Sequence, residues 1–204
     1  MTKTMYTILL VAMAAVLAII VPSGSAKVYP YGGFMGDNDT QSVCGNNNIT
    51  YPDKYTARAL GGGVMHCGLC GACSNRHDID IYLRTRENLT QVTRRCAFLS
   101  TFSYEKSRQC VKENVGFTES CLDCWMANIL CDRKLCYAVC LKSMLLDEPY
   151  VDENGNLNDC LQCDEDKCGP AFVACAGANR RRACIHSDIM RDENAICKDC
   201  DQVY

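Results

Sequence analysis

Cysteine content constrains this chain more than any other feature, because 18 of its 204 residues are cysteine. In a chain that enters an oxidising compartment, cysteine at about a tenth of the residues is typical of a fold held together by disulfides. The even count fits nine bridges, but spacing alone does not fix which cysteines pair. We expect disulfides at all of them: Cys44, Cys67, Cys70, Cys73, Cys96, Cys110, Cys121, Cys124, Cys131, Cys136, Cys140, Cys160, Cys163, Cys168, Cys175, Cys184, Cys197 and Cys200.

The N-terminus has the pattern of a secretory signal peptide. Lys3 precedes an apolar run over residues 8–21, and the small residues Gly24 and Ala26 follow it. This run is shorter than the roughly 20 residues of a membrane-spanning helix, and no second run of this kind occurs. We therefore predict a signal peptide at residues 1–26. The mature chain is expected to lack a transmembrane anchor and to be secreted, extracellular or in the lumen of the secretory pathway.

Glycosylation and partner class follow from the same compartment. The sequons at Asn38, Asn48 and Asn88 become acceptor sites once the chain is secreted. Removal of Lys3, the only charged residue among the first 26, changes the net charge from −3 to −4, and charges of both signs are interspersed along the rest. Because no basic stripe is present, we expect no nucleic-acid partner but an extracellular protein or glycan.

The spacing of apolar residues predicts a mostly α fold. Residues 27–65 are rich in Gly and Asn and indicate an irregular N-terminal arm, whereas residues 66–204 form a cysteine-rich helical domain. Ser74 or Asn75, Thr118, Asp132 and Ser187 are expected to cap helices. The prediction is a disulfide-rich bundle of five or six short helices, over residues 77–99, 104–115, 121–130, 134–146, 171–182 and 188–200.

Two short patterns recur in the helical domain. CLDC at 121, CLQC at 160 and CKDC at 197 resemble one another, and Cys-Asp-x-x-x-Cys occurs at Cys131 and again at Cys163. Degenerate helical-hairpin repeats with cross-bridges would explain this echo. Between them, Asn154-Gly155 marks a tight turn in the acidic stretch 147–159.

The stretch HCGLCGACSNRHD at residues 66–78 admits several kinds of chemistry. Its CxxC pairs are the pattern of a redox dithiol, but the preceding GGGVMH makes a poor strand for such a site. Cys67, Cys70, His66 and His77 have the residue types of a zinc site, although thiols in an oxidising compartment tend to pair with one another first. We favour a staple that fastens the arm to the first long helix.

A hydrolytic alternative rests on CSNRHDIDIY, residues 73–82, which resembles the catalytic helix of secreted phospholipase A2. In that family an adjacent His-Asp pair lies on a disulfide-stapled helix, where the His activates water and the Asp helps to hold calcium. The resemblance implies His77 as the base and Asp78 as a calcium ligand. The sequence departs from the family pattern in having three residues between Cys73 and His77 and no paired cysteines before the His.

The structural interpretation of the same pair is a helix start. Asp78 would then meet the positive end of the helix dipole, and His77 would lie on the surface. Helical phasing also places Asp78 on the core-facing arc of the predicted helix, together with Tyr82 and Leu89. A carboxylate there needs a partner, such as Arg76 or an arginine of residues 180–182.

Other candidate features have plainer interpretations. The acidic stretch at 152–163 begins like an EF-hand but has Leu157 and Cys163 where glycine and glutamate are required. Trp125 is expected in the core, and the arginines at 180–182 are expected to pair with the acidic residues at 159–166.

We therefore predict a secreted, disulfide-stabilised binding or structural extracellular protein without catalytic activity. No cofactor is expected. The alternative is a calcium-dependent phospholipase A2-like lipid hydrolase that uses His77 and Asp78, and calcium belongs to that alternative alone.

Overall fold

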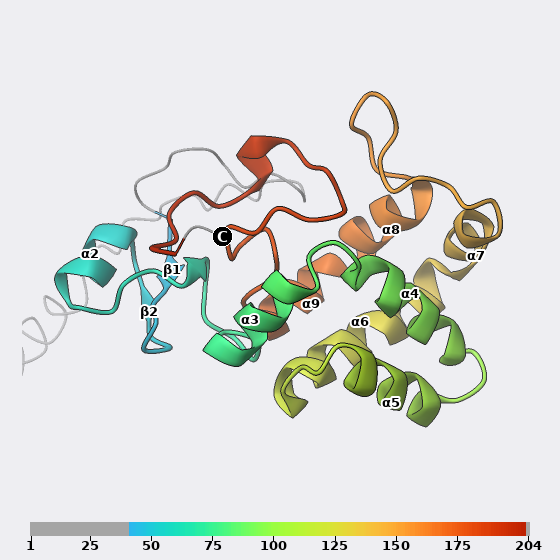
Figure 1. The fold of residues 1–204 in the computed structure, drawn as a ribbon, viewed down its shortest axis with the longest axis horizontal. Coiled ribbons are helices and arrows are strands. Elements are labelled where there is room, and N and C mark those ends of the chain that lie inside the picture. The colour runs from blue at the N-terminus through green and yellow to red at the C-terminus, as the bar shows by residue number, and fades with distance from the viewer. Residues whose placement is uncertain (1–40, 203–204) are drawn as a thin grey trace, which may run out of the picture.

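The computed structural model describes residues 41–202 of the chain. The predicted signal peptide at 1–26 and the sequon at Asn38 lie outside these residues. The described part contains eight α-helices, one short 3-10 helix and one small sheet, so the predicted mostly helical, disulfide-rich fold is confirmed (Figure 1). None of the helices in this part combines the length and apolar character needed to cross a membrane.

A small sheet and one short helix form the beginning of the described chain. Strands β1 (Val43–Cys44), β2 (Thr50–Tyr51) and β3 (His66–Cys67) pair antiparallel in the order β2-β1-β3. Helix α2 (Lys54–Ala59) begins at Asp53, whose carboxylate accepts from the backbone N–H of Thr56. The Gly- and Asn-rich composition gave no sign of these elements, which are only two to six residues long.

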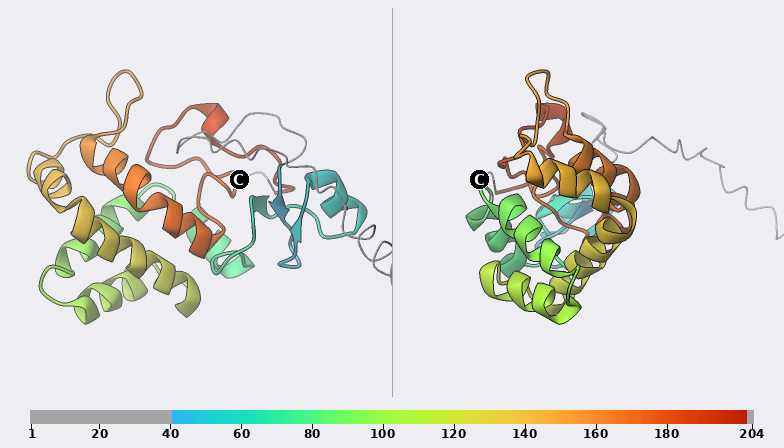
Figure 2. Two further views of the ribbon diagram at one scale, coloured as in Figure 1. Left: turned by 180° about the vertical axis from the view of Figure 1, so that it is seen from behind. Right: turned by 90° about the vertical axis from the view of Figure 1, so that its right-hand side faces the viewer.

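Seven further helices make up the rest of the fold. They are α3 (Arg76–Arg84), α4 (Leu89–Leu99), α5 (Tyr104–Asn114), α6 (Glu119–Leu135), α7 (Tyr137–Leu145), α8 (Asp159–Lys167) and α9 (Gly169–Ala176). Helix α4 packs on α5, whereas α6 contacts α5, α8 and α9. Seen from behind, α8 and α9 follow one another along nearly one line beside α6 (Figure 2). The main core lies among these helices and includes Tyr82, Leu89, Leu122, Met126 and Ile185.

Three predicted helices differ from the structure, each for a physical reason. The helix predicted over 77–99 is two helices, because the chain turns after Thr85, whose hydroxyl donates to the carbonyl of Ile81 at 2.7 Å, and α4 restarts at Asn88. The core-facing arc predicted for this segment is kept in part: Tyr82, Leu89 and Cys96 are buried, and Val92 and Leu99 are partly buried.

The helix predicted over 188–200 is wrong. Only the 3-10 turn η1 (Glu193–Ala195) forms there, and Asp192 rather than Ser187 caps it. Cys197 and Cys200 are bonded to different segments, Cys67 and Cys184, which holds the chain in a loop.

The helix predicted over 171–182 also ends early, at Ala176. Gly177 then adopts a φ of 69°, a left-handed conformation that glycine tolerates, and the arginines that follow lie outside the helix. Helix α8 was not predicted, although Asn158 caps it by accepting from the N–H of Leu161. The predicted turn at 154–155 is present, between the bridged residues Val151 and Leu157.

Nine disulfides join the 18 cysteines and leave none free. The two Cys-Asp-x-x-x-Cys patterns face each other on α6 and α8, where Cys131 bonds to Cys168 and Cys136 to Cys163. They are thus the two sides of one antiparallel clasp, which we call the α6–α8 clasp. The remaining bridges are Cys44–Cys70, Cys67–Cys197, Cys73–Cys121, Cys96–Cys110, Cys124–Cys175, Cys140–Cys160 and Cys184–Cys200.

Candidate ligand-binding groove

The cysteines of the 66–78 stretch each bond to a distant segment. Cys70 bonds to Cys44 in the arm, Cys67 to Cys197 near the C-terminus, and Cys73 to Cys121 on α6. A redox pair between residues 67 and 70 is therefore not formed. The thiols that the zinc alternative required are bonded as disulfides, and so are those of Cys184, Cys197 and Cys200, which lie close together.

His66, the third zinc candidate, is fully buried and holds the stretch in shape. Its Nδ1 lies 2.9 Å from the carbonyl of Cys67, and its Nε2 lies 2.7 Å from the hydroxyl of Ser74. Burial lowers the pKa of His66 to about 4, so the imidazole is neutral near pH 7. The ring therefore joins β3 to the turn before α3.

Asp78 is fully buried, and its carboxylate fastens α3 to the start of α6. Oδ1 accepts from the backbone N–H of Thr118 at 2.8 Å, and Oδ2 accepts from the Thr118 hydroxyl at 2.5 Å and from Asn75 Nδ2 at 2.6 Å. Thr118 precedes the first turn of α6, so the negative charge also meets the positive end of that helix. The prediction that Arg76 or an arginine at 180–182 would be the partner of Asp78 is wrong.

His77 is exposed and lies apart from this network. Its Nε2 lies 2.8 Å from the carbonyl oxygen of Gly116, in the turn after α5. Among the described residues no hydrogen bond joins His77 to Asp78. The structure thus gives the two neighbouring side chains separate partners.

Two other sequence features occupy exposed positions. The sequon residues Asn48 and Asn88 both have exposed side chains. In the acidic turn, both oxygens of Asp152 accept from nearby groups, including the backbone N–H groups of Asn154 and Asn156. These bonds to the carboxylate hold the pKa of Asp152 below its ordinary value.

Of the arginines at 180–182, Arg181 pairs with the acidic segment as predicted, whereas Arg180 pairs with Asp188 outside it. Arg181 and Arg191 both contact Glu165 on α8, at 2.7 and 2.6 Å, while Arg180 bonds to Asp188 at 2.5 Å. The three arginines and Glu165 line a second cavity of about 120 Å³, which lies beside the predicted core residue Trp125. Trp125 itself stacks on Phe117 and meets Phe172 edge to face.

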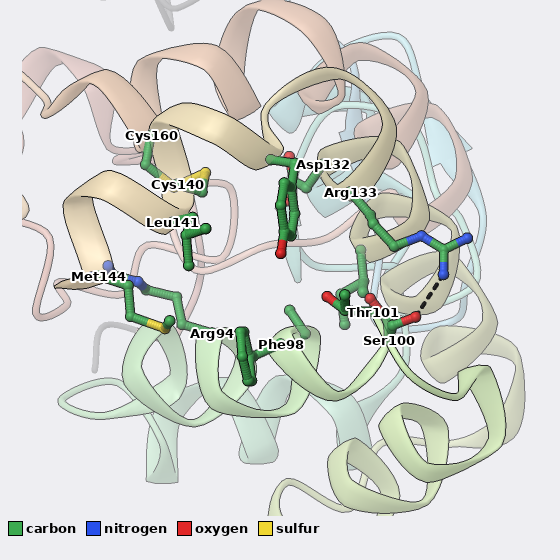
Figure 3. Close-up of a pocket in the computed structure, with 13 residues that line it drawn as sticks. Arg94, Phe98, Ser100, Thr101, Asp132, Arg133, Cys140, Leu141, Met144 and Cys160 are labelled. Carbon is green, nitrogen blue, oxygen red and sulfur yellow. Dashed lines mark hydrogen bonds between the residues drawn. A yellow bond between two sulfur atoms is a disulfide. The ribbon is translucent and has the colours of Figure 1, made fainter.

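An apolar groove opens between α4, α6 and α7 (Figure 3). These helices lie at the end of the bundle away from the small sheet (Figure 1). Its cavity volume is about 100 Å³ and it opens to solvent, so a bound molecule would lie only partly enclosed along it. The disulfide Cys140–Cys160 forms part of its wall and ties α7 to α8. The groove is lined by Arg94, Ala97, Phe98, Ser100, Thr101, Ile129, Asp132, Arg133, Tyr137, Cys140, Leu141, Met144 and Cys160.

Large apolar side chains stand exposed around this groove. Phe98 is 38 % exposed and contacts Phe102, which is 75 % exposed, with ring centroids 5.6 Å apart. Leu145, next to the groove residue Met144, is 73 % exposed. Surface apolar side chains gathered beside a concave site mark a place where another molecule binds more often than do scattered ones.

Polar groups at the groove have incomplete partners. The hydroxyl of Ser100 is buried without a hydrogen-bond partner among the described residues, and so is Oδ1 of Asp132. Burial, with the neighbouring Asp164, raises the pKa of Asp132 to about 8. The raised pKa favours the neutral form of this carboxyl. Its predicted role as the cap of a fourth helix is wrong, because it lies inside α6.

The groove was not predicted from the sequence. Its residues belong to three helices, and none of them forms a local motif. One feature of the sequence could have indicated it. The apolar residues of α7 occur on more than one face of the helix, whereas an amphipathic helix needs only one apolar face to pack on the core.

Searches of curated proteins and of solved structures give no match to this chain. Residues 104–199 match a family of unknown function (DUF8771). The matched residues include the α6–α8 clasp and the α6 and α7 sides of the groove, whereas α4, which supplies the opposite side, precedes them.

Proposed function

We propose that this protein is a secreted binding protein that holds a small, mostly apolar molecule in the groove between α4, α6 and α7. The observation that carries the proposal is the groove itself, a concave apolar site with exposed aromatic and aliphatic side chains beside it. Sites for small ligands are concave and mostly apolar, with a few polar groups that fix orientation. Asp132, Arg133, Ser100 and Thr101 are such groups here.

The disulfide framework supports a preformed site. Cys140–Cys160 lies in the groove wall, and the α6–α8 clasp holds the two helices behind it. A site that is already rigid loses less conformational entropy when a ligand binds, which favours affinity. Nine disulfides also indicate an oxidising compartment, in agreement with the signal peptide expected at residues 1–26.

The test uses N-phenyl-1-naphthylamine, a neutral dye whose fluorescence rises in apolar surroundings, with the full secreted chain. We expect saturable binding to the parent. Leu141→Gln, which places an amide in the groove wall, should weaken dye binding about tenfold. The matched control is Leu60→Gln, because Leu60 is 69 % exposed at the end of α2 and does not line the groove.

Far-UV circular dichroism of both variants shows whether the fold is kept. If the parent does not bind the dye, or if Leu141→Gln binds it as the parent does while keeping its fold, the proposal is wrong.

A further inference from the structure

The polar and apolar side chains of the groove are separated along its length. In Figure 3, Leu141, Met144, Phe98 and the disulfide between α7 and α8 gather on one side, whereas Arg133, Ser100 and Thr101 gather on the other. A ligand that matched this pattern would have an apolar body and a polar head. The head would lie beside Arg133.

Arg133 has hydrogen-bonding capacity to spare. Within residues 41–202 its only hydrogen bond goes from Nη1 to the carbonyl oxygen of Ser100, and it takes part in no ion pair. Its side chain is exposed in the last turn of α6. A guanidinium has five N–H donors in a planar fork that suits a carboxylate or another oxyanion.

Arg94, the second arginine of the groove, is engaged differently. Its guanidinium carbon lies 5.5 Å from the ring centroid of Tyr150, a cation–π distance, and the side chain lies next to Met144 in Figure 3. Its stem can cover apolar surface at that end. We therefore assign the head-group contact to Arg133 and not to Arg94.

The remaining charges at the groove do not oppose an anion. Asp132 is the only carboxylic acid among the lining residues, and burial beside Asp164 raises its pKa, which favours its neutral form. The buried hydroxyl of Ser100, which lacks a partner, lies in the residue whose carbonyl holds Arg133. Arg133 is therefore the cationic group at the polar end of the groove.

We infer that the groove binds a single-chain amphiphile with an anionic head, of the fatty-acid class, with its head on Arg133 and its chain along Phe98, Leu141 and Met144. This inference rests on the proposed function and adds the charge and the orientation of the ligand. It does not require any reaction of the ligand.

Displacement of N-phenyl-1-naphthylamine by three twelve-carbon compounds tests the inference. These are dodecanoate, dodecanol and dodecyltrimethylammonium, each used below the concentration at which it forms micelles. We expect dodecanoate to displace the dye at a concentration at least about tenfold lower than either of the others, because a hydrogen bond to a charged group contributes more than one between neutral groups.

Variants locate the head group. Arg133→Gln should lower the affinity for dodecanoate about tenfold and leave that for dodecanol unchanged, and Arg133→Lys should restore part of the loss. Lys134→Gln is the matched control, because it removes the same charge from the next position of α6 and Lys134 does not line the groove. Arg94→Gln should have less than about a threefold effect.

The outcomes separate the two proposals. If the dye binds in the groove but dodecanol competes as well as dodecanoate, or the cation competes better than both, the anionic ligand is refuted and the binding function remains. The same holds if Arg133→Gln and Lys134→Gln have equal effects. If neither the dye nor any twelve-carbon compound binds, both proposals are wrong.

Discussion

Replacement of Asp78 distinguishes a structural His-Asp pair from a catalytic one. Asp78→Ala removes the acceptor of three hydrogen bonds, two from Thr118 and one from Asn75, in a site with no exposure to solvent. A hydrogen bond to a charged group contributes about 1.5–3 kcal/mol, and such contributions are not additive within one network. The donors of Thr118 and Asn75 would be left buried without an acceptor, and each unsatisfied group costs about 1–3 kcal/mol. We therefore expect Asp78→Ala to lower the free energy of unfolding by about 3–5 kcal/mol.

His77→Ala provides the comparison within the same pair. His77 is exposed and makes one hydrogen bond, to the carbonyl of Gly116, so its loss should cost about 1 kcal/mol or less. Asp78→Asn should be intermediate, since its amide keeps an acceptor for the Thr118 N–H but has no second acceptor for Asn75. The assay is equilibrium unfolding in guanidinium chloride with the disulfides intact, followed by circular dichroism.

Calcium binding distinguishes a phospholipase A2-like site from a structural role of Asp78. A phospholipase A2-like site would bind calcium through Asp78, so calcium would raise the unfolding midpoint of the parent but not of Asp78→Asn, and the parent would hydrolyse phospholipid esters with calcium present. That result, or an Asp78→Ala variant within about 1 kcal/mol of the parent, would refute the structural assignment.

Three more predictions concern stability. Replacing both Cys136 and Cys163 by alanine removes one of the two disulfides of the α6–α8 clasp and should lower the free energy of unfolding by about 2–3 kcal/mol. The loss is limited because neighbouring disulfides already constrain the loop of 27 residues that this disulfide closes. An unchanged free energy of unfolding would contradict the prediction. Burial and the neighbouring Asp164 raise the pKa of Asp132 to about 8, so its neutral carboxyl stabilises the fold fully below pH 4 and progressively less up to pH 8. The unfolding midpoint of the parent should therefore fall between pH 4 and pH 8, and that of Asp132→Asn should fall less. For His66 the pH dependence of stability has the opposite sign, because burial lowers its pKa to about 4. The neutral ring stabilises the fold fully above pH 6.5, and about 3 kcal/mol of the free energy of unfolding is lost as the pH falls to 4. The stability of His66→Gln should therefore fall less at acidic pH than that of the parent.

Local features of the fold were predictable where one short segment determines them. The cap at Asn75 and the turn at Gly155 each depend on a residue whose own conformational preference decides the outcome. Asp132 was misassigned for the converse reason: Cys131-Asp132 looks like the start of a new helix, but two bridges to α8 hold it within the continuous helix α6. Long-range pairing overrode the local preference there.

The candidate groove could not be predicted from the sequence, because it depends on how the cysteines of the same clasp pair. Cys131–Cys168 and Cys136–Cys163 align α8 antiparallel to the end of α6, and Cys140–Cys160 then brings α7 alongside α8. Once these three bridges are set, α7 presents Leu141 and Met144 toward α4 rather than toward the main core. The disulfides therefore do more than stabilise the fold, since their pairing decides which apolar face of α7 stays uncovered and lines the groove.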